Sequence, residues 1–308
     1  MLRGRPDWLR APTSVDRHGC ALRRDRSVVG PRAPGDRVKT DKRDSRRLVR
    51  LYRAGELVAV RVPTPEEEAV RDLCRARADL VADRRRARQR LGSFLLRHAR
   101  VYRAGGAWTR GHAAWLAAQT FDQPALTAAF DHYRGVLAVR DAAVAAITAD
   151  LAVWYDRAPF VEAVHRLGAY RGITHLGGLT LACEVCDWRR FPRAGVFMGF
   201  VGLVASEYST GSSTQRGPLT KAGNEHVRTQ LVESAWAYQH RPRDRGGLAR
   251  RQDRAGPEVL ASSWAAQLRL HRRFAALLAR RKPPPVAAAA IARELARFVW
   301  AEMTADAA

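Results

Sequence analysis

The chain has 308 residues, 46% of them hydrophobic, which is enough for two domains with real cores and argues against a disordered chain. Its formal net charge of +24 predicts a polyanionic partner, nucleic acid first, although codon usage in a GC-rich genome can supply part of an arginine excess. A charged N-terminus and an apolar run at 196–205 that is too short to cross a bilayer argue against a signal peptide and a membrane partner.

Residues 1–36 are rich in Arg, Pro and Gly and show neither strand alternation nor a helical period, so we expect them to be poorly ordered. Asp41 and Asp44 then lie three positions apart at the start of a helical pattern, on one helix face. They could bind Mg²⁺ through their oxygens, or they could be helix N-terminal acids favoured by the macrodipole. Residues 57–62 read as a short strand.

Two long helices are expected next, over 65–102 and 124–155, with a glycine break at 105–106 and a short amphipathic piece between them. The two helices could pair as an antiparallel coiled-coil hairpin. An arginine run at 84–90 is either a solvated helix face or a contact with a nucleic-acid backbone.

Residues 166–182 have the form helix, glycine turn, helix, which resembles a helix-hairpin-helix. In such a motif the N–H groups of the turn hold a phosphate, and we place Arg171, Gly172, Arg189 and Arg190 near nucleic acid. His165 and His175 are expected to be surface or core histidines. The pair Cys183 and Cys186 has the spacing of half a zinc site without a second pair, so two small helix residues in a reducing cytoplasm are favoured.

The stretch 195–238 is the most informative part of the chain. An apolar run at 196–205, of strand or buried-helix type, leads into a hydroxyl-rich loop at 206–220, and Asn224 is the predicted N-cap of the helix that follows. That helix should bury one face, made up of Val227, Leu231, Ser234, Ala235 and Tyr238.

The hydroxyl-rich loop has two interpretations. Beside Arg216, Lys221, Asn224 and Arg228 it suits phosphate chemistry, in which a serine attacks and arginine binds the anion. A solvated Ser/Gly loop without such a role is the other interpretation. Two further helices are expected over 257–281 and 286–303.

The order of residues in this stretch, GLVASEYSTGSSTQRGPLTKAGNEHVRTQLVESAW, resembles the signature of a large bacterial family of insertion-sequence transposases. Members of that family pair an N-terminal resolvase-like DEDD domain with a serine-containing transposase domain and resemble recombinases guided by a bridge RNA. The resemblance runs from about residue 34 to near the C-terminus and is most specific over 167–238.

This resemblance implies a mainly α fold with a truncated α/β, RNase H-like N-terminal domain. The expected parts are a divergent N-terminus at 1–36, a DEDD remnant at 37–64, a coiled-coil spacer at 65–158 and a helical transposase domain with a helix-hairpin-helix at 159–308. The strands that carry the first two acids of the family's quartet are not found, so we expect the start to be truncated or shifted out of frame.

The same resemblance implies the chemistry. Asp41 and Asp44 would be the last two acids of the quartet and Mg²⁺ ligands, and the nucleophile would be Ser209 or, second, Thr210, the residue directly before Gly211. Implied partners are DNA (element ends and target), a guide RNA and further copies of the chain. The alternative is a catalytically inactive, nucleic-acid-binding remnant of such a transposase.

Overall fold

The computed structural model describes residues 40–56 and 61–305 and divides the chain into two compact units, Met1–Thr64 and Pro65–Ala308. The expectations for residues 1–36, and most of the strand expected at 57–62, lie outside the described residues. In the described part the structure is mainly helical, with one small two-stranded sheet.

The described part of the first unit contains helix α1, Asp41–Arg53. Thr40 caps its N-terminus, with its hydroxyl oxygen accepting from the backbone N–H of Arg43 at 3.3 Å. Asp41 and Asp44 therefore lie in the first turn of a helix, as their spacing predicts. Asp41 is exposed, and the side chain of Asp44 lies outside what the structure describes.

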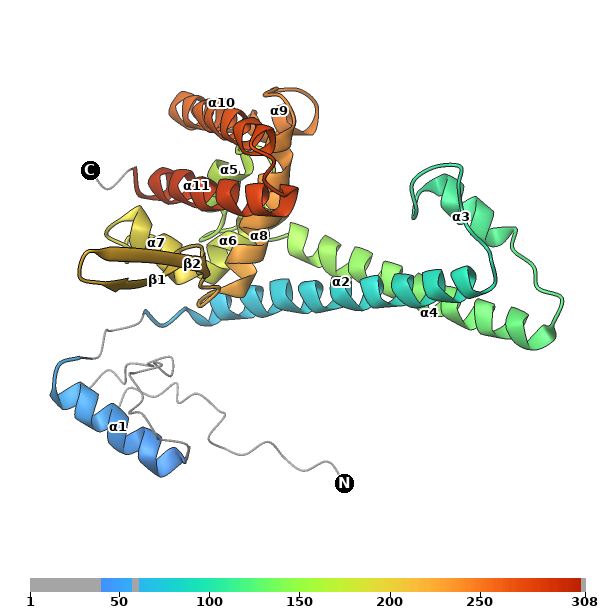
Figure 1. Ribbon diagram of the computed structural model, residues 1–308, viewed down its shortest axis with the longest axis horizontal. Helices are drawn as coiled ribbons and strands as arrows, with labels where there is room; N and C mark the ends of the chain where they lie inside the picture. The colour runs from blue at the N-terminus through green and yellow to red at the C-terminus, as the bar shows by residue number, and fades with distance from the viewer. Residues whose placement is uncertain (1–39, 57–60, 306–308) are drawn as a thin grey trace. The chain divides into compact units, whose positions relative to one another are not determined.

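A long helical hairpin begins the second unit. Helices α2 (Pro65–Arg97) and α4 (Pro124–Ala152) run antiparallel, and the short helix α3 (Arg110–Ala117) lies near their far end (Figure 1). The seam between the helices is apolar, with Leu91, Phe94, Phe130 and Leu137 all buried. Both predicted long helices are confirmed, and α2 ends five residues earlier than the predicted 102.

In the rest of the second unit α8 packs on α6, α7 and α11, and α10 packs on α11. The helices of this part are α5 Val161–Gly168, α6 His175–Val185, α7 Ala194–Val201, α8 Glu225–Ala235, α9 Gly247–Gln252, α10 Pro257–Ala279 and α11 Pro284–Thr304. Asn224 caps α8, and the predicted apolar face is buried, with Tyr238 in a 3₁₀ turn, Trp236–Gln239. That face packs on α11, where Ile291 and Leu295 are fully buried. The prediction for this helix is confirmed, as are the helices expected at 257–281 and 286–303.

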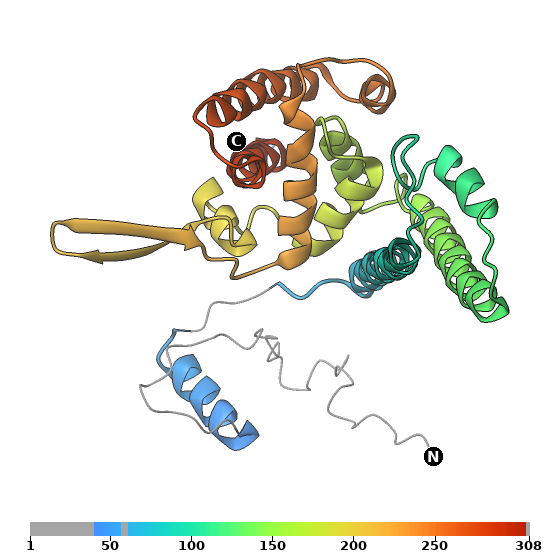
Figure 2. The ribbon, with the colours of Figure 1, turned by 45° about the vertical axis from the view of Figure 1, so that its right-hand side comes forward.

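The expected loop at 206–220 is wrong, because most of it forms a β-hairpin. Strands β1 (Ala205–Thr210) and β2 (Ser213–Leu219) pair antiparallel, and Figure 2 shows the hairpin extending away from the helices. Gly211 has φ +54° and opens the two-residue turn, as in type II′ hairpins. The apolar run before it forms α7 and not a strand. In the described residues no helix is long and apolar enough to span a membrane.

Candidate functional site

One face of the β-hairpin carries a serine beside a carboxylate and an arginine. Ser209 and Glu207 are two positions apart on β1, so their side chains project on the same side, and Glu207 lies opposite Arg216 on β2. The Ser209 hydroxyl donates to Glu207 Oε1 at 2.6 Å, and Arg216 Nε lies 3.8 Å from Glu207 Oε2. All three residues are exposed, so an incoming polyanion can reach them.

Thr210 lies on the opposite face of the same strand. It pairs with Ser213 at the turn and shares its face with Tyr208, whose side chain is 82% exposed. The structure gives Thr210 no carboxylate neighbour equivalent to the one at Ser209 in the part of the chain it describes. The two candidate nucleophiles are therefore distinguished by strand register, which the sequence alone did not reveal.

The base of the hairpin is fixed by three of the predicted phosphate-binding residues. Lys221 is exposed, and its backbone N–H donates to the carbonyl of Gly202 at 3.1 Å. The Arg228 guanidinium donates to the carbonyl of Val201 at 2.9 Å. Asn224 is buried, and its Oδ1 accepts from the N–H of Val227 at 3.0 Å as a helix cap. Lys221 thus remains open to a ligand, whereas Asn224 acts within the fold.

Asn224 also reaches an ion pair whose carboxylate, that of Glu184, is 1% exposed. Its Nδ2 donates to Glu184 Oε2 at 2.8 Å, while Arg75 Nε and Nη2 donate to the two oxygens of Glu184 at 2.7 and 2.9 Å. Burial raises the pKa of Glu184, but the hydrogen bonds from Arg75 and Asn224 outweigh it and hold that pKa below its ordinary value. Glu184 therefore ties the long hairpin to the helix that follows the serine strand.

The glycine turn between α5 and α6 is closed against α8. Gly172 has φ +85°, and a Cβ there would overlap the carbonyl oxygen of Ser234. Arg171 is buried and donates through Nη1 to the carbonyl of Arg241 at 2.6 Å. The helix, turn, helix form is confirmed, and contact of Arg171 and Gly172 with nucleic acid stays a prediction.

Three other predicted features lie elsewhere on the second unit. Arg189 is exposed, and the Arg190 guanidinium stacks over the rings of Phe191 and Phe200, 4.6 Å from each centroid.

In the arginine run at 84–90 of α2, Arg84 and Arg88 lie 3.7 and 3.3 Å from the carboxylate of Asp141 on α4. Part of that run therefore joins the two long helices.

The histidine pair is half-buried on α5 and α6. His165 Nε2 is hydrogen-bonded to Asp156 Oδ1 at 2.7 Å, and its ring centroid lies 5.0 Å from that of His175. Burial lowers the pKa of His175. These contacts agree with the expected surface or core role.

The residues described do not assemble a metal centre. Nowhere in the described ranges do three or more His, Cys, Asp or Glu side chains gather as they would around a metal ion. Cys183 is buried and Cys186 half-buried, and both are free thiols. Asp41 and Asp44 belong to the first unit, and Ser209 and Thr210 to the second. These two aspartates alone do not supply the six oxygen ligands that Mg²⁺ requires.

Glu207 is the site residue that sequence reasoning missed. The signal was available, because Gly-Ser between two hydroxyl-rich segments is a turn pair typical of a β-hairpin. A hairpin would have placed residues 207 and 209 on one face. The missing cue was apolar alternation, which is absent since the strands are exposed on both faces.

Comparison with known proteins assigns the family. A family model for the transposase IS116/IS110/IS902 family matches residues 164–247, and one for the DEDD transposase domain of IS110 type matches residues 27–99. The protein y4qE of Sinorhizobium fredii is 42% identical over 271 residues, which are 88% of this chain and 66% of that relative. The transposase for insertion sequence element IS1533 of Leptospira borgpetersenii is 31% identical over 249 residues, 79% of this chain and 71% of the relative.

The chain belongs to the IS110/IS116/IS902 family of insertion-sequence transposases. This confirms the resemblance drawn from residues 195–238. The chain spans slightly less than two thirds of the y4qE relative, at 66% of its length. What the whole relatives do is therefore carried to this chain only as a proposal.

Proposed function

We propose that this chain acts in DNA transposition as the transposase of an insertion sequence, and that Ser209 is the nucleophile that cleaves and rejoins DNA strands. The observation that carries the proposal is the 2.6 Å hydrogen bond from the Ser209 hydroxyl to Glu207 on an exposed hairpin. A serine hydroxyl becomes a nucleophile when a positioned base takes its proton. Family membership supplies DNA as the substrate class.

Residues of the hairpin supply the nucleophile, the proton acceptor and a cation for the proposed cleavage step. Ser209 Oγ forms a bond to a backbone phosphorus, one P–O ester bond of the strand breaks, and the hydroxyl proton passes to the carboxylate of Glu207. The released strand oxygen takes up a proton, and Arg216 neutralises charge on the phosphate. Rejoining reverses the step, when a strand hydroxyl attacks the phosphoserine bond and releases Ser209.

Exposure of the hairpin on both faces supports its proposed role in contacting the nucleic-acid substrate. A two-stranded hairpin alone is marginally stable in water, and this one has few apolar contacts beyond its base at Ala205 and Leu219. We expect bound nucleic acid to cover it. Arg216, Lys221 and Arg189 are the exposed cations predicted to contact the backbone.

Three further features are proposed from family membership. An RNase H-like N-terminal DEDD domain contributes Asp41 and Asp44, and a guide RNA directs the reaction. The chain assembles into a homo-oligomer through the long helical hairpin. Mg²⁺, where a complete acid set binds it, would polarise the scissile phosphate. The match of the DEDD family model to residues 27–99 supports this domain.

A nucleic-acid-binding protein without cleavage activity is the second candidate. It is favoured by the lack of three converging metal ligands among the residues described. On this account the chain alone shows little or no strand cleavage, even with an RNA guide. Robust Mg²⁺-dependent recombination by the 308-residue chain would exclude it.

The test of the proposed function is a recombination assay with donor DNA, target DNA and the RNA encoded beside the element. The unaltered chain, or its fusion to the N-terminal domain of the y4qE relative, should form sequenceable junctions. Ser209→Ala should abolish them, and Glu207→Gln should reduce them by about a hundredfold, since a general base contributes that much or more. Ser213→Ala, at the same turn, is the matched control. Junctions that persist with Ser209→Ala would contradict the proposal.

A further inference from the structure

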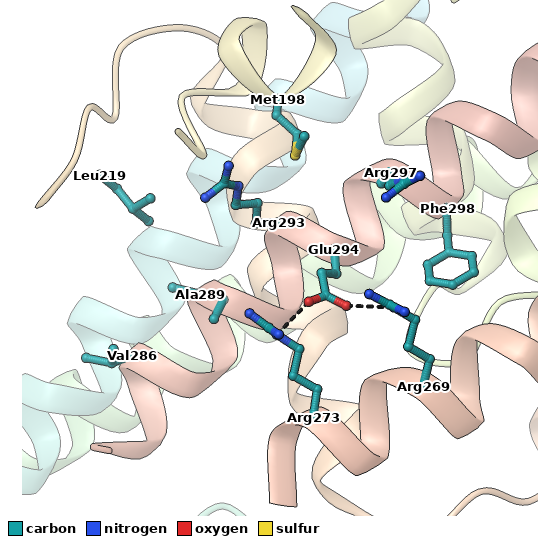
Figure 3. Close-up of a pocket in the computed structure, with 11 residues that line it drawn as sticks. Met198, Leu219, Arg269, Arg273, Val286, Ala289, Arg293, Glu294, Arg297 and Phe298 are labelled. Carbon is teal, nitrogen blue, oxygen red and sulfur yellow. Dashed lines mark hydrogen bonds and ion pairs between the residues drawn. The ribbon is translucent and has the colours of Figure 1, made fainter. Parts of the chain in front are cut away.

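A cavity of about 450 Å³ lies between α10 and α11, away from the residues predicted from the sequence (Figure 3). Leu219, the last residue of β2, and Met198 of α7 border it. The cavity therefore adjoins the base of the strand pair that carries Ser209. Neither the sequence motifs nor the hairpin chemistry accounts for it.

The charges around this cavity do not balance. Arg269 and Arg273 reach it from α10, Arg293 and Arg297 from α11, and Glu294 is the one carboxylate among its lining residues. Both oxygens of Glu294 are occupied by the α10 pair, with Arg269 Nε at 3.0 Å and Arg273 Nε at 2.5 Å. Figure 3 shows Glu294 held between these two guanidinium groups.

The α11 arginines are left without compensation. Arg293 and Arg297 are exposed, and neither has an ion pair or a side-chain hydrogen bond to any residue that the structure describes. They are four positions apart on one helix, a spacing at which like charges repel. A bound anion would relieve this repulsion and could accept bidentate hydrogen bonds from each guanidinium.

The floor of the cavity is apolar. Met198, Leu219 and Phe298 are half-buried against the core and keep one side toward the cavity. A ligand that fits both features has an anionic group and a flat, weakly polar body. An unpaired nucleotide has this composition, with a phosphate for the arginines and a base for the aromatic surface. Bases stacked inside a duplex cannot enter a cavity.

We propose that this cavity binds a nucleotide of a single-stranded nucleic-acid segment, with its phosphate at Arg293 and Arg297 and its base against Phe298. The inference rests on the proposed function and adds a second contact point for the strand. Leu219 is five residues along β2 from Thr214, the partner of Ser209, which is about 17 Å of extended strand. The site would therefore anchor the nucleic acid a few nucleotides from the cleavage point.

The test compares two double variants that remove the same charge. Arg293→Gln/Arg297→Gln alters the cavity, while Arg272→Gln/Arg280→Gln alters exposed arginines of α10 and its C-terminus that do not line it. Binding of a fluorescent single-stranded DNA, the same sequence as RNA, and the DNA duplex is titrated for each. The cavity variant should lose about tenfold more single-strand affinity than the control, and its salt slope should fall by about 1.4, the value for two single-strand phosphate contacts.

Phe298→Leu provides a second readout, because it keeps the charge and removes the aromatic surface. It should weaken single-strand binding and leave duplex binding unchanged. Equal losses in the two double variants, or equal losses for duplex and single strand, would overturn the inference. The DNA and RNA arms identify which polymer the cavity prefers.

Failure of the cleavage chemistry is distinguishable in the same assay. Binding of these probes does not require cleavage, so a wrong assignment of the nucleophile leaves the binding result intact. Lack of binding by the unaltered chain to all probes would overturn both the inference and the proposed function.

Discussion

Arg75 Nε on α2 donates to Glu184 Oε1 on α6 at 2.7 Å, and the Glu184 side chain is only 1% exposed. The second Glu184 oxygen accepts from Asn224, the cap of the helix that follows the serine hairpin. One carboxylate thus joins the long helical hairpin, the domain core and the base of the candidate site. Nearby, Val70 and Cys74 of α2 pack on the same core cluster as Leu179 and Cys183 of α6.

Breaking this pair should destabilise the second unit. Glu184→Ala leaves the Arg75 guanidinium and the Asn224 amide without their acceptor, and removal of one partner of a buried pair costs about 3 kcal/mol. Arg75→Ala should cost at least as much, since it leaves the Glu184 carboxylate, which is only 1% exposed, without its cation. Urea unfolding of the two single variants and the double variant measures the coupling. Additive losses would show that the pair makes no direct contribution.

The lowered pKa of Glu184 predicts how this stabilisation depends on pH. A carboxyl whose folded pKa lies below its unfolded value of about 4.3 stabilises fully above that pH and loses its contribution as pH falls through the folded pKa. The melting temperature of the unaltered chain should therefore exceed that of Glu184→Gln near neutral pH, and the gap should narrow in acid. A gap that widens below pH about 4 would contradict the assignment.

Gly172 offers a test of the closed glycine turn. Gly172→Ala combines a positive φ with an overlap on the Ser234 carbonyl, so we expect a loss of about 2 kcal/mol or more. Gly195→Ala is the matched control, because its Cβ would enter open space in helix α7, and it should be neutral or slightly stabilising. Thermal unfolding of both variants measures the difference. Similar values would mean that the turn is not packed against α8.

The net charge of +24 predicts nucleic-acid binding that falls steeply with salt. Each phosphate contact to duplex DNA should add about 0.9 to the slope of log affinity against log salt concentration. Arg216→Gln should reduce that slope by about one contact. Fluorescence anisotropy from low to physiological salt measures it, and a flat response would remove the nucleic-acid interpretation.

The helices were predictable because their signals are local. Pro65 and Pro124 open the long helices, Asn224 caps α8, and the buried face of α8 follows the helical period. The β-hairpin was not predicted, since Tyr208 and its neighbours on both strands remain exposed and give no apolar alternation. For the same reason Glu207 was overlooked beside Ser209.

The cavity at Arg293 and Arg297 could not be predicted from the sequence, for a different reason. It depends on how α10 and α11 cross and on which arginines Glu294 engages, and neither is encoded in local spacing. The buried position of Arg171 is of the same kind, because its guanidinium binds carbonyls of a loop about seventy residues further along the chain. Long-range packing decided both.

The most direct test of the central claim is the identity of the residue that becomes joined to DNA. The protein for this test is the chain fused to the N-terminal domain of the y4qE relative. A nicked DNA substrate would trap its covalent intermediate, because the released strand is lost and cannot be rejoined. After nuclease and protease digestion, mass spectrometry should find the nucleotide on Ser209 of the hairpin peptide, and Ser209→Ala should remove the adduct. A nucleotide on Thr210 would leave the nucleophile on the hairpin but refute the role of Glu207. An adduct outside residues 205–219 would contradict the assignment of the nucleophile to the hairpin.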